Sequence, residues 1–253
     1  MKQLEINNNR APYIFRYRPD NNFTLDEISN SYIYFPNSEK LNDPFDANSE
    51  MLDIVYTPSE FQMLFETVFE NMPLEARQYF KKTFENKPEE LFAFVNNSKQ
   101  EFIGKFGIAC FTISELNLLL WASYANNHKG LCIQYNIEYD KEYFSGIRQV
   151  EYFKNFEKIK YHPASNPDGF QDVLFKKFHL WSNEFELRLL KVNEGKFHHK
   201  KEAIRNIIFG LRASDEFKSE IVEIIRSKYQ HVKLYQPLIF KESFEMGYQE
   251  LIL

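Results

Sequence analysis

Glycine is scarce in this chain, and its scarcity limits which nucleotide-binding folds the chain can form. Eight of the 253 residues are glycine, about half of the usual usage of roughly 7%. The Walker phosphate loop and the GxGxxG dinucleotide fingerprint need closely spaced glycines, because the backbone must turn tightly and approach the phosphates. Neither pattern occurs in the sequence. P-loop NTPases and standard dinucleotide-binding Rossmann domains are therefore poor candidates.

The charge balance is mildly acidic. The chain has 31 Lys and Arg residues against 36 Asp and Glu residues, which gives a formal net charge of −5. Proteins that coat DNA without sequence preference need a basic face. The composition disfavours that function but is compatible with a local basic pocket.

The cysteines and the amino-terminal residues indicate a cellular location. Cys110 and Cys132 lie in apolar, strand-like runs, so we expect buried thiols in a reducing compartment and no disulfide. Residues 1–10 are polar and rich in asparagine, unlike a signal peptide. No apolar run approaches the roughly 18 residues that suggest a membrane span. We expect a cytoplasmic protein with no membrane association.

Strand-like and helical patterns alternate without regular strand–helix–strand spacing. Between about 58 and 103 apolar residues recur every three or four positions, which predicts helices. Thr24 and Glu27 form a capping-box pattern at the start of a helix over 25–30. We predict one α+β domain over residues 1–253, with a mixed β-sheet and a helical insertion near 58–103. The predicted strands are 12–18, 32–35, 107–112, 131–135, 150–153, 184–192, 204–211 and 232–240, and the other predicted helices are 116–125, 170–180 and one from 214.

The first polar cluster is Arg16–Tyr17–Arg18 in the opening strand. Arg16 and Arg18 share one face, because strand side chains alternate. Two guanidinium groups on one face can clamp a phosphate or pyrophosphate through bidentate bonds. The alternative is that both arginines make structural ion pairs.

The second cluster is the loop LNDPFD, residues 41–46. We expect its apolar side chains, Leu41 and Phe45, to anchor the loop in the core. The polar groups then offered to a ligand are those of Asn42, Asp43 and Asp46. A structural turn in which these side chains bond nearby backbone explains the pattern equally well.

The third cluster is aromatic. Trp121 and Tyr124 are three residues apart, so they share one face of the expected helix. That face can stack on a base or a nicotinamide ring, and the tyrosine hydroxyl offers a polar handle. The same segment continues to His128, which we count among the candidate ligand-binding residues. A core position for Trp121 is the alternative.

The fourth cluster is acidic. On the expected strand 184–192, Glu184, Glu186 and Arg188 project to one face, while Phe185 and Leu187 enter the core. Two carboxylates on one face repel each other unless something uses or neutralises them. Arg188 is the candidate neutraliser. In the functional interpretation, one carboxylate stabilises an oxocarbenium-like transition state and the other orients or deprotonates the acceptor.

Signatures of metal sites and hydrolases are missing from the sequence. The six histidines stand outside any CxxC, HxxxH or HExxH context. No GxSxG occurs. We therefore predict no zinc site and no metal ligands.

The four clusters, in this order, resemble an uncharacterised, mostly bacterial family called "domain of unknown function two-nine-seven-one". The matching pieces are FRYRP, YFPNSEKLNDPFD, CFTISELNLLLWASYANNHKGLCIQY and WSNEFELRLL. They cover most of the chain outside the helical insertion, and LNDPFD together with WASYANNHKG is the most specific part. The family name implies no activity.

A second resemblance is to the ADP-ribosyltransferase superfamily, which implies a split mixed β-sheet that grips NAD as substrate. It also implies that Arg16 or Arg18 binds the NAD phosphates and that Glu184 and Glu186 match the E-x-E pair, with Glu186 catalytic. The candidate catalytic residues are Tyr124, Glu184 and Glu186. The candidate NAD-binding residues are Arg16, Tyr17, Arg18, Asn42, Asp43, Trp121, His128 and Arg188.

Three functions remain open. The first is an NAD-consuming ADP-ribosyltransferase or glycohydrolase. Such an enzyme would be a toxin or phage-defence effector, with a nucleic-acid or protein acceptor and an antitoxin or defence-system partner. The second is a Mg²⁺-dependent nuclease that uses Asp43, Asp46 and Glu186. The third is a non-catalytic sensor that binds a nucleotide or nucleic acid. The transferase hypothesis requires the arginines of the first strand and the late carboxylates to line one pocket.

Overall fold

The computed structural model describes residues 12–252 apart from 56, 58–59, 163–168 and 244. The fold is mixed α and β, as predicted. Its contacts divide the chain into two compact units. The first unit comprises Met1–Phe35, Ile108–Gln149 and Ser182–Leu253, and the second comprises Pro36–Gly107 and Val150–Trp181. The expected helical insertion falls inside the second unit, which also takes in segments on either side of it.

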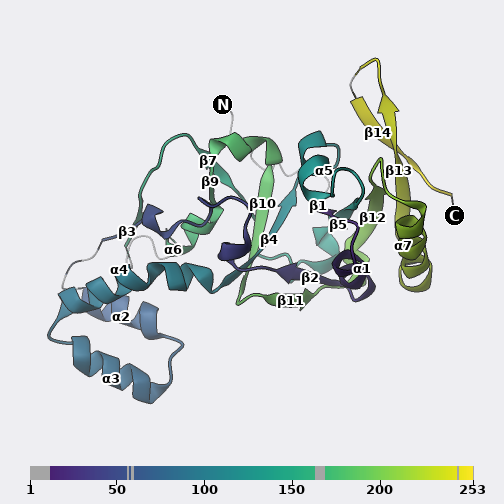
Figure 1. The fold of residues 1–253 in the computed structure, drawn as a ribbon. Helices are drawn as coiled ribbons and strands as arrows, with labels where there is room; N and C mark the ends of the chain where they lie inside the picture. Colours follow the sequence, from purple (N-terminus) through teal and green to yellow (C-terminus); the bar gives the residue numbers. More distant parts are fainter. Residues whose placement is uncertain (1–11, 56, 58–59, 163–168, 244, 253) are drawn as a thin grey trace. The chain divides into compact units, whose positions relative to one another are not determined.

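An eight-stranded mixed sheet organises the first unit (Figure 1). Its strands follow the order β14-β13-β12-β5-β1-β4-β10-β6. Strand β1 lies between β5 and β4 and is antiparallel to both, whereas β12 and β13 are parallel. The strand bounds are β1 (Tyr13–Arg18), β4 (Phe106–Thr112), β5 (Leu131–Asn136), β6 (Arg148–Gln149), β10 (Glu186–Val192), β12 (Ile204–Phe209), β13 (Lys233–Phe240) and β14 (Glu245–Glu250). A separate pair joins β2 (Tyr32–Phe35) to β11 (Gly195–His198).

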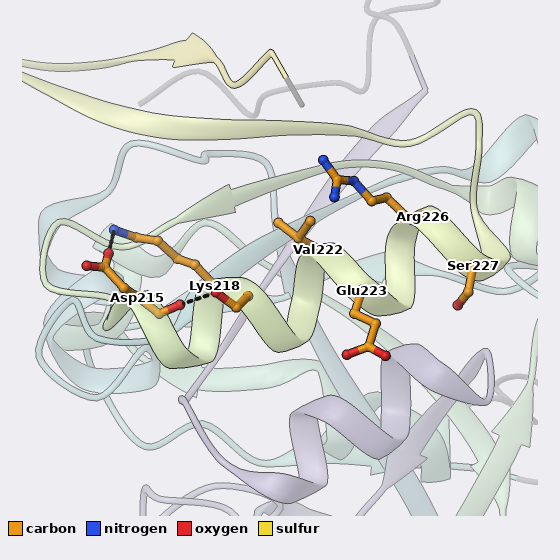
Figure 2. A pocket seen from close by; sticks show the side chains of 7 residues that line it. Asp215, Lys218, Val222, Glu223, Arg226 and Ser227 are labelled. Atoms are coloured by element: carbon orange, nitrogen blue, oxygen red, sulfur yellow. Dashed lines mark hydrogen bonds and ion pairs between the residues drawn. The ribbon is translucent and has the colours of Figure 1, made fainter.

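Helix α7 (Asp215–Lys228) begins where the sequence predicts it. Ser214 is its N-cap, and its hydroxyl accepts a hydrogen bond from the backbone N–H of Phe217. The polar side of the helix carries a shallow surface pocket with Asp215, Lys218 and Arg226 on its border (Figure 2). Alternating charges along an exposed helix face are ordinary for a solvated surface.

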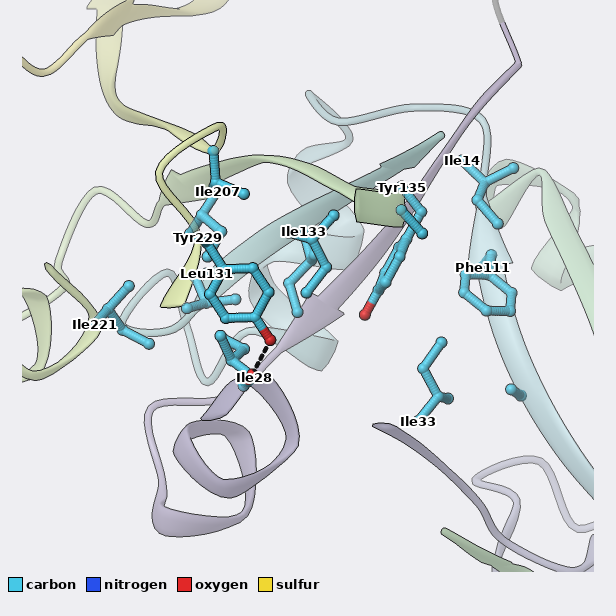
Figure 3. Close-up of a cluster of buried hydrophobic side chains, with 14 of the residues drawn as sticks. Ile14, Ile28, Ile33, Phe111, Leu131, Ile133, Tyr135, Ile207, Ile221 and Tyr229 are labelled. Carbon is cyan, nitrogen blue, oxygen red and sulfur yellow. Dashed lines mark hydrogen bonds between the residues drawn. The ribbon is translucent and has the colours of Figure 1, made fainter. Parts of the chain in front are cut away.

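Side-chain alternation gives the sheet two differently packed faces. One face, here called the large-core face, carries Ile14 of β1 and the buried side of α7 (Figure 3). Leu187 of β10 belongs to the same core. Helix α1 (Asn22–Ser29) covers the same face through Ile28, whose carbonyl accepts a hydrogen bond from the Tyr229 hydroxyl. The other face, here called the small-core face, carries Phe15, Tyr17 and the helix α5 (Leu118–Tyr124).

The start of α1 differs from the prediction. Asn21, not Thr24, is the N-cap, and its side chain accepts a hydrogen bond from the Thr24 N–H. The helix therefore begins three residues earlier than the capping-box pattern indicates. Glu27 is consequently not a capping residue. Its buried carboxylate faces the arginines of β1 instead.

The second unit contains the predicted helices and two short parallel strand pairs. The helices are α2 (Phe61–Phe69), α3 (Leu74–Phe84), α4 (Pro88–Gly104) and the short α6 (Gly169–Asp172). The pairs join β3 (Leu52–Ile54) to β8 (Ile159–Tyr161), and β7 (Glu151–Phe153) to β9 (Lys176–Phe178). Stacked phenylalanine rings join α2, α3 and α4, with the ring of Phe69 4.9 Å from Phe80 and 5.9 Å from Phe94. No helix in the described part of the chain is long and apolar enough to cross a membrane.

The predicted helix over 170–180 is wrong. The α-helix ends at Asp172 and a 3-10 turn, Val173–Phe175, follows, but Lys176–Phe178 form β9 and break the helix before a further 3-10 helix begins at His179. The Lys176 ammonium lies 3.5 Å from the carboxylate of Glu151 and 3.5 Å from the ring centroid of Phe153. Pairing with β7, a contact distant in sequence, thus overrides a local pattern compatible with a helix.

Candidate functional site

Strand β10 carries a buried ion pair. Glu186 is 3% exposed and Arg188 is 0% exposed. The Arg188 Nε lies 2.6 Å from Glu186 Oε1, and Nη2 lies 3.3 Å from Oε2. Leu187 belongs to the large core, so Glu186 and Arg188 project to the small-core face. Arg188 therefore neutralises Glu186. This is the structural alternative that the sequence predicts for Arg188.

Glu184 does not lie on the strand, contrary to the prediction. It ends a 3-10 helix, His179–Glu184, and Phe185 turns the chain at φ +48° before β10 begins. Phe185 is consequently 39% exposed and does not enter the core. The Glu184 carbonyl accepts a 2.7 Å hydrogen bond from the hydroxyl of Thr112 on β4. This bond holds Glu184 against the sheet.

Tyr124 reaches the same place from α5. Its hydroxyl donates a 2.7 Å hydrogen bond to Oε1 of Glu184. Burial, together with the nearby negative charge of Glu184, raises the pKa of Tyr124 well above its ordinary value. The phenol therefore stays protonated at neutral pH and acts as a donor. The three predicted catalytic residues thus lie on one side of the sheet.

The two arginines of β1 bind a protein carboxylate. Arg16 pairs with Oε1 of Glu27 and also donates to the carbonyl of Tyr34 at 3.3 Å. The Arg18 Nε lies 2.8 Å from Glu27 Oε2. Glu27 thus takes the position between two guanidinium groups that the sequence analysis assigned to a ligand phosphate. The structural alternative for Arg16 and Arg18 is the one the structure bears out.

The arginines and the late carboxylates lie on opposite faces of the sheet. Arg16 and Arg18 alternate with Phe15 and Tyr17, which belong to the small core, so both arginines project to the large-core face. Glu186 projects to the other side. The expectation of one pocket that joins them is therefore wrong. A strand fixes the relative orientation of its own side chains, but it does not fix which face a second strand presents.

Tyr17 and Trp121 pack together as part of the small core. The Tyr17 ring meets the indole edge-to-face at 5.0 Å, and its hydroxyl donates to the carbonyl of Ser114 at 3.0 Å. Trp121 is 1% exposed, and its Nε1 donates to the carbonyl of Glu115 at 2.9 Å. The prediction that these rings bind a ligand is thus corrected, because protein groups already enclose them.

His128 lies in a tightly built loop. Asn126, Asn127 and His128 all have positive φ angles, of 45°, 54° and 68°, which non-glycine residues adopt at a cost. The His128 ring stacks on Trp121 with centroids 6.0 Å apart. Burial and, to a lesser extent, the charge of Arg212 lower the pKa of His128. A neutral imidazole packed on the core indole is a poor partner for a phosphate.

The Asn-Asp-Pro loop belongs to the second unit, and the expectation for it is wrong at Phe45, Asp43 and Asp46 but not at the half-buried Leu41. Phe45 is 71% exposed, whereas Asp43 and Asp46 are buried. Asp43 Oδ1 accepts a 2.9 Å hydrogen bond from the Phe45 N–H, and Asp46 Oδ1 accepts one of 2.9 Å from the Ala47 N–H. The Asp43 bond, to the N–H two residues on, is the turn bond of the structural alternative. Asn42 is exposed.

Two residues make contacts that differ from those predicted for them. Glu27 was interpreted as a helix cap, although it is the counter-ion of Arg16 and Arg18. Lys177 was placed in a helix, but it is buried with its Nζ 3.9 Å from Asp46 Oδ2 and 5.0 Å from the Trp181 ring centroid. An acidic residue in a short helix directly after an Arg-x-Arg strand was the available signal for Glu27.

Comparisons of the chain with protein-family models, curated proteins and solved structures find no match. The described residues contain no group of three or more His, Cys, Asp or Glu side chains arranged to hold a metal ion. The site is therefore characterised by its geometry alone: a tyrosine, two carboxylates and a guanidinium group on the small-core face.

Proposed function

We propose that the chain is an NAD-consuming enzyme of the ADP-ribosyltransferase type, with its chemistry at Tyr124, Glu184 and Glu186. The observation that carries the proposal is the 2.7 Å bond from the Tyr124 hydroxyl to Glu184, on the sheet face that also holds Glu186. Segments 60 residues apart bring the Tyr124 phenol and the Glu184 carboxylate into contact there. Paired carboxylates are the groups that glycosidic chemistry uses.

The proposed reaction breaks the bond between the nicotinamide nitrogen and C1′ of the ribose. The bonding electrons leave with nicotinamide, and the sugar carbon becomes an oxocarbenium-like centre. The Glu186 carboxylate, oriented by its ion pair with Arg188, is proposed to stabilise that positive charge, while Glu184, held by Tyr124, orients a ribose hydroxyl or the acceptor. Water or an acceptor nucleophile then bonds to C1′ and releases a proton to a carboxylate or solvent.

The sequence-based form of this hypothesis required Arg16 and Arg18 to share one pocket with the late carboxylates, and that requirement fails because the arginines face the other side of the sheet. We therefore propose the enzyme in a narrower form, in which Arg16 and Arg18 take no part and Arg188 is the guanidinium group on the carboxylate face. The proposal therefore rests on the carboxylates and the tyrosine. The acceptor it implies is water, a nucleic acid or a protein. The corresponding biological role is that of a toxin or phage-defence effector in the cytoplasm, controlled by an antitoxin or another defence-system partner.

The test is nicotinamide release, measured by chromatography after the chain is incubated with NAD alone and with RNA, DNA or protein acceptors. We expect release by the wild type and a loss of at least about 100-fold in Glu186→Gln. Glu216→Gln, an exposed change on α7, should keep the full rate. Tyr124→Phe serves as a second variant if Glu186→Gln does not fold. Failure of the wild type with every acceptor, or full activity in folded Glu186→Gln, would refute the proposal.

A second candidate, a non-catalytic nucleotide sensor, is favoured by one observation on the opposite face. Two guanidinium groups share the single carboxylate of Glu27, which leaves one positive charge in excess. Burial and the neighbouring Arg16 lower the pKa of Arg18, so an anion there would relieve an electrostatic cost. This function predicts saturable nucleotide binding without any product, and weaker binding in Arg18→Gln.

A further inference from the structure

The second unit contains a cavity of about 430 Å³. Its lining comes from α2 and the turn after it, α4 and the residue after it, α6, β8 and the first residue of β4. Small-molecule sites usually measure about 300–1,000 Å³. None of the residues assigned to the proposed NAD site lines this cavity, so it is a separate feature.

The interior of the cavity is apolar and rich in aromatic rings. Val95 and Tyr161 are buried in it, and Phe102 and Phe170 are half-buried. The Phe170 ring meets Phe102 edge-to-face at 6.1 Å and Tyr161 edge-to-face at 5.8 Å. This interlocked arrangement fixes the ring directions, because edge-to-face contact is a preferred geometry. The aromatic ring of a ligand can pack edge-to-face against these side chains in the same geometry.

The rim of the cavity carries a cation. Lys105 is exposed, and its Nζ lies 4.8 Å from the ring centroid of Phe102. Among the described residues that line the cavity, it is the only one with a formal charge. An apolar interior beneath a single ammonium group suits a molecule with an aromatic body and one negative group at its end.

We propose that this cavity binds a small aromatic anion, such as an aromatic carboxylate or sulfonate. The aromatic body lies against Phe102 and Phe170, and the anionic group lies beside the Lys105 ammonium. Most of the affinity comes from apolar burial, since an exposed ion pair contributes little. The Lys105 ammonium therefore contributes more to selectivity for an anionic ligand than to binding affinity.

Two fluorescent probes test this with the full chain: anilinonaphthalene sulfonate and its uncharged counterpart, phenylnaphthylamine. We expect each to bind saturably at one site per chain. Lys105→Gln should weaken sulfonate binding about two- to fivefold and leave amine binding unchanged. Lys82→Gln, which removes an exposed lysine on α3, is the matched control and should alter neither. Met72→Trp, which fills the cavity from its wall, should abolish both.

Circular dichroism in the near ultraviolet confirms that each variant keeps its packing, because loosely packed states also bind such dyes. If Met72→Trp does not fold, Val68→Phe fills the same space. The inference is overturned if the wild type binds neither probe saturably, or if the folded cavity-filling variant binds both as the wild type does. Equal weakening of both probes in Lys105→Gln would overturn the selection for an anion.

Discussion

Tyr124 and Glu184 are joined by a 2.7 Å hydrogen bond from the phenol to the carboxylate. The bond ties the end of α5 to the turn that precedes β10. Glu184 is also held through its carbonyl by the Thr112 hydroxyl. A buried carboxylate is tolerated only when donors compensate for its lost hydration. The contact therefore stabilises the fold and positions the side chain proposed to act on substrate.

Tyr124→Phe separates these two roles. The change removes the donor and leaves the Glu184 carboxylate buried with one partner fewer. We expect a loss of about 1–3 kcal/mol in the free energy of unfolding, measured by urea titration. In the proposed enzyme, nicotinamide release should fall more steeply than the stability does. Tyr79→Phe, at an exposed tyrosine on α3, is the control, and a Tyr124→Phe protein as stable and active as this control would contradict the assignment.

Glu27→Gln tests the carboxylate between the two arginines. The variant keeps the shape of the side chain but leaves Arg16 and Arg18 without their counter-charge on the large-core face. Removing one partner of a buried pair costs about 3–5 kcal/mol, because the other charge stays buried and uncompensated. Arg18 is partly exposed, so the lower end is expected. Denaturant unfolding should show this loss in Glu27→Gln and almost none in Glu220→Gln on the exposed side of α7.

Elements with strong local signals were predictable from the sequence. The aromatic run 13–18 forms β1 and the Ser214 cap starts α7, because strand propensity and capping act over a few residues. The helices between Phe61 and Gly104 follow their apolar spacing in the same way. The segment 170–180 shows the limit, since β9 exists only through pairing with β7.

The candidate site was only partly predictable, for a related reason. Glu186 and Arg188 were correctly placed on one face, because alternation along a single strand is local. Whether that face is shared with Arg16 depends on how β10 and β1 are turned within the sheet, which no short pattern encodes. The counter-ion of Arg16 is Glu27, 11 residues away, and only folding brings the two together.

Acid should weaken the contact between α1 and β11. Asp26 accepts hydrogen bonds from Lys196 of β11 at 2.8 Å and from the Tyr32 hydroxyl at 2.6 Å. These donors lower the pKa of Asp26 from 3.8 to about 2. A carboxylate with a lower pKa in the folded state contributes stability that is present above pH 3.8 and is lost as the pH falls towards 2. The melting temperature of the wild type should therefore fall more between pH 4 and 2 than that of Asp26→Asn. Parallel curves over that interval would contradict the prediction.

Gly130 has no room for a side chain. A β-carbon there would lie 2.0 Å from the carbonyl oxygen of Arg18, a backbone atom that cannot move aside without displacing β1. We expect Gly130→Ala to destabilise the fold by about 1–3 kcal/mol, the usual cost of overpacking.

Gly104→Ala is the matched change at the end of α4, where nothing lies within 4 Å of the added atom. It should be neutral or raise stability by up to about 1 kcal/mol, because alanine favours helix more than glycine does. Thermal unfolding of the two variants compares the sites directly. A melting temperature of Gly130→Ala equal to or higher than that of Gly104→Ala would contradict the close approach of Gly130 to the Arg18 carbonyl of β1.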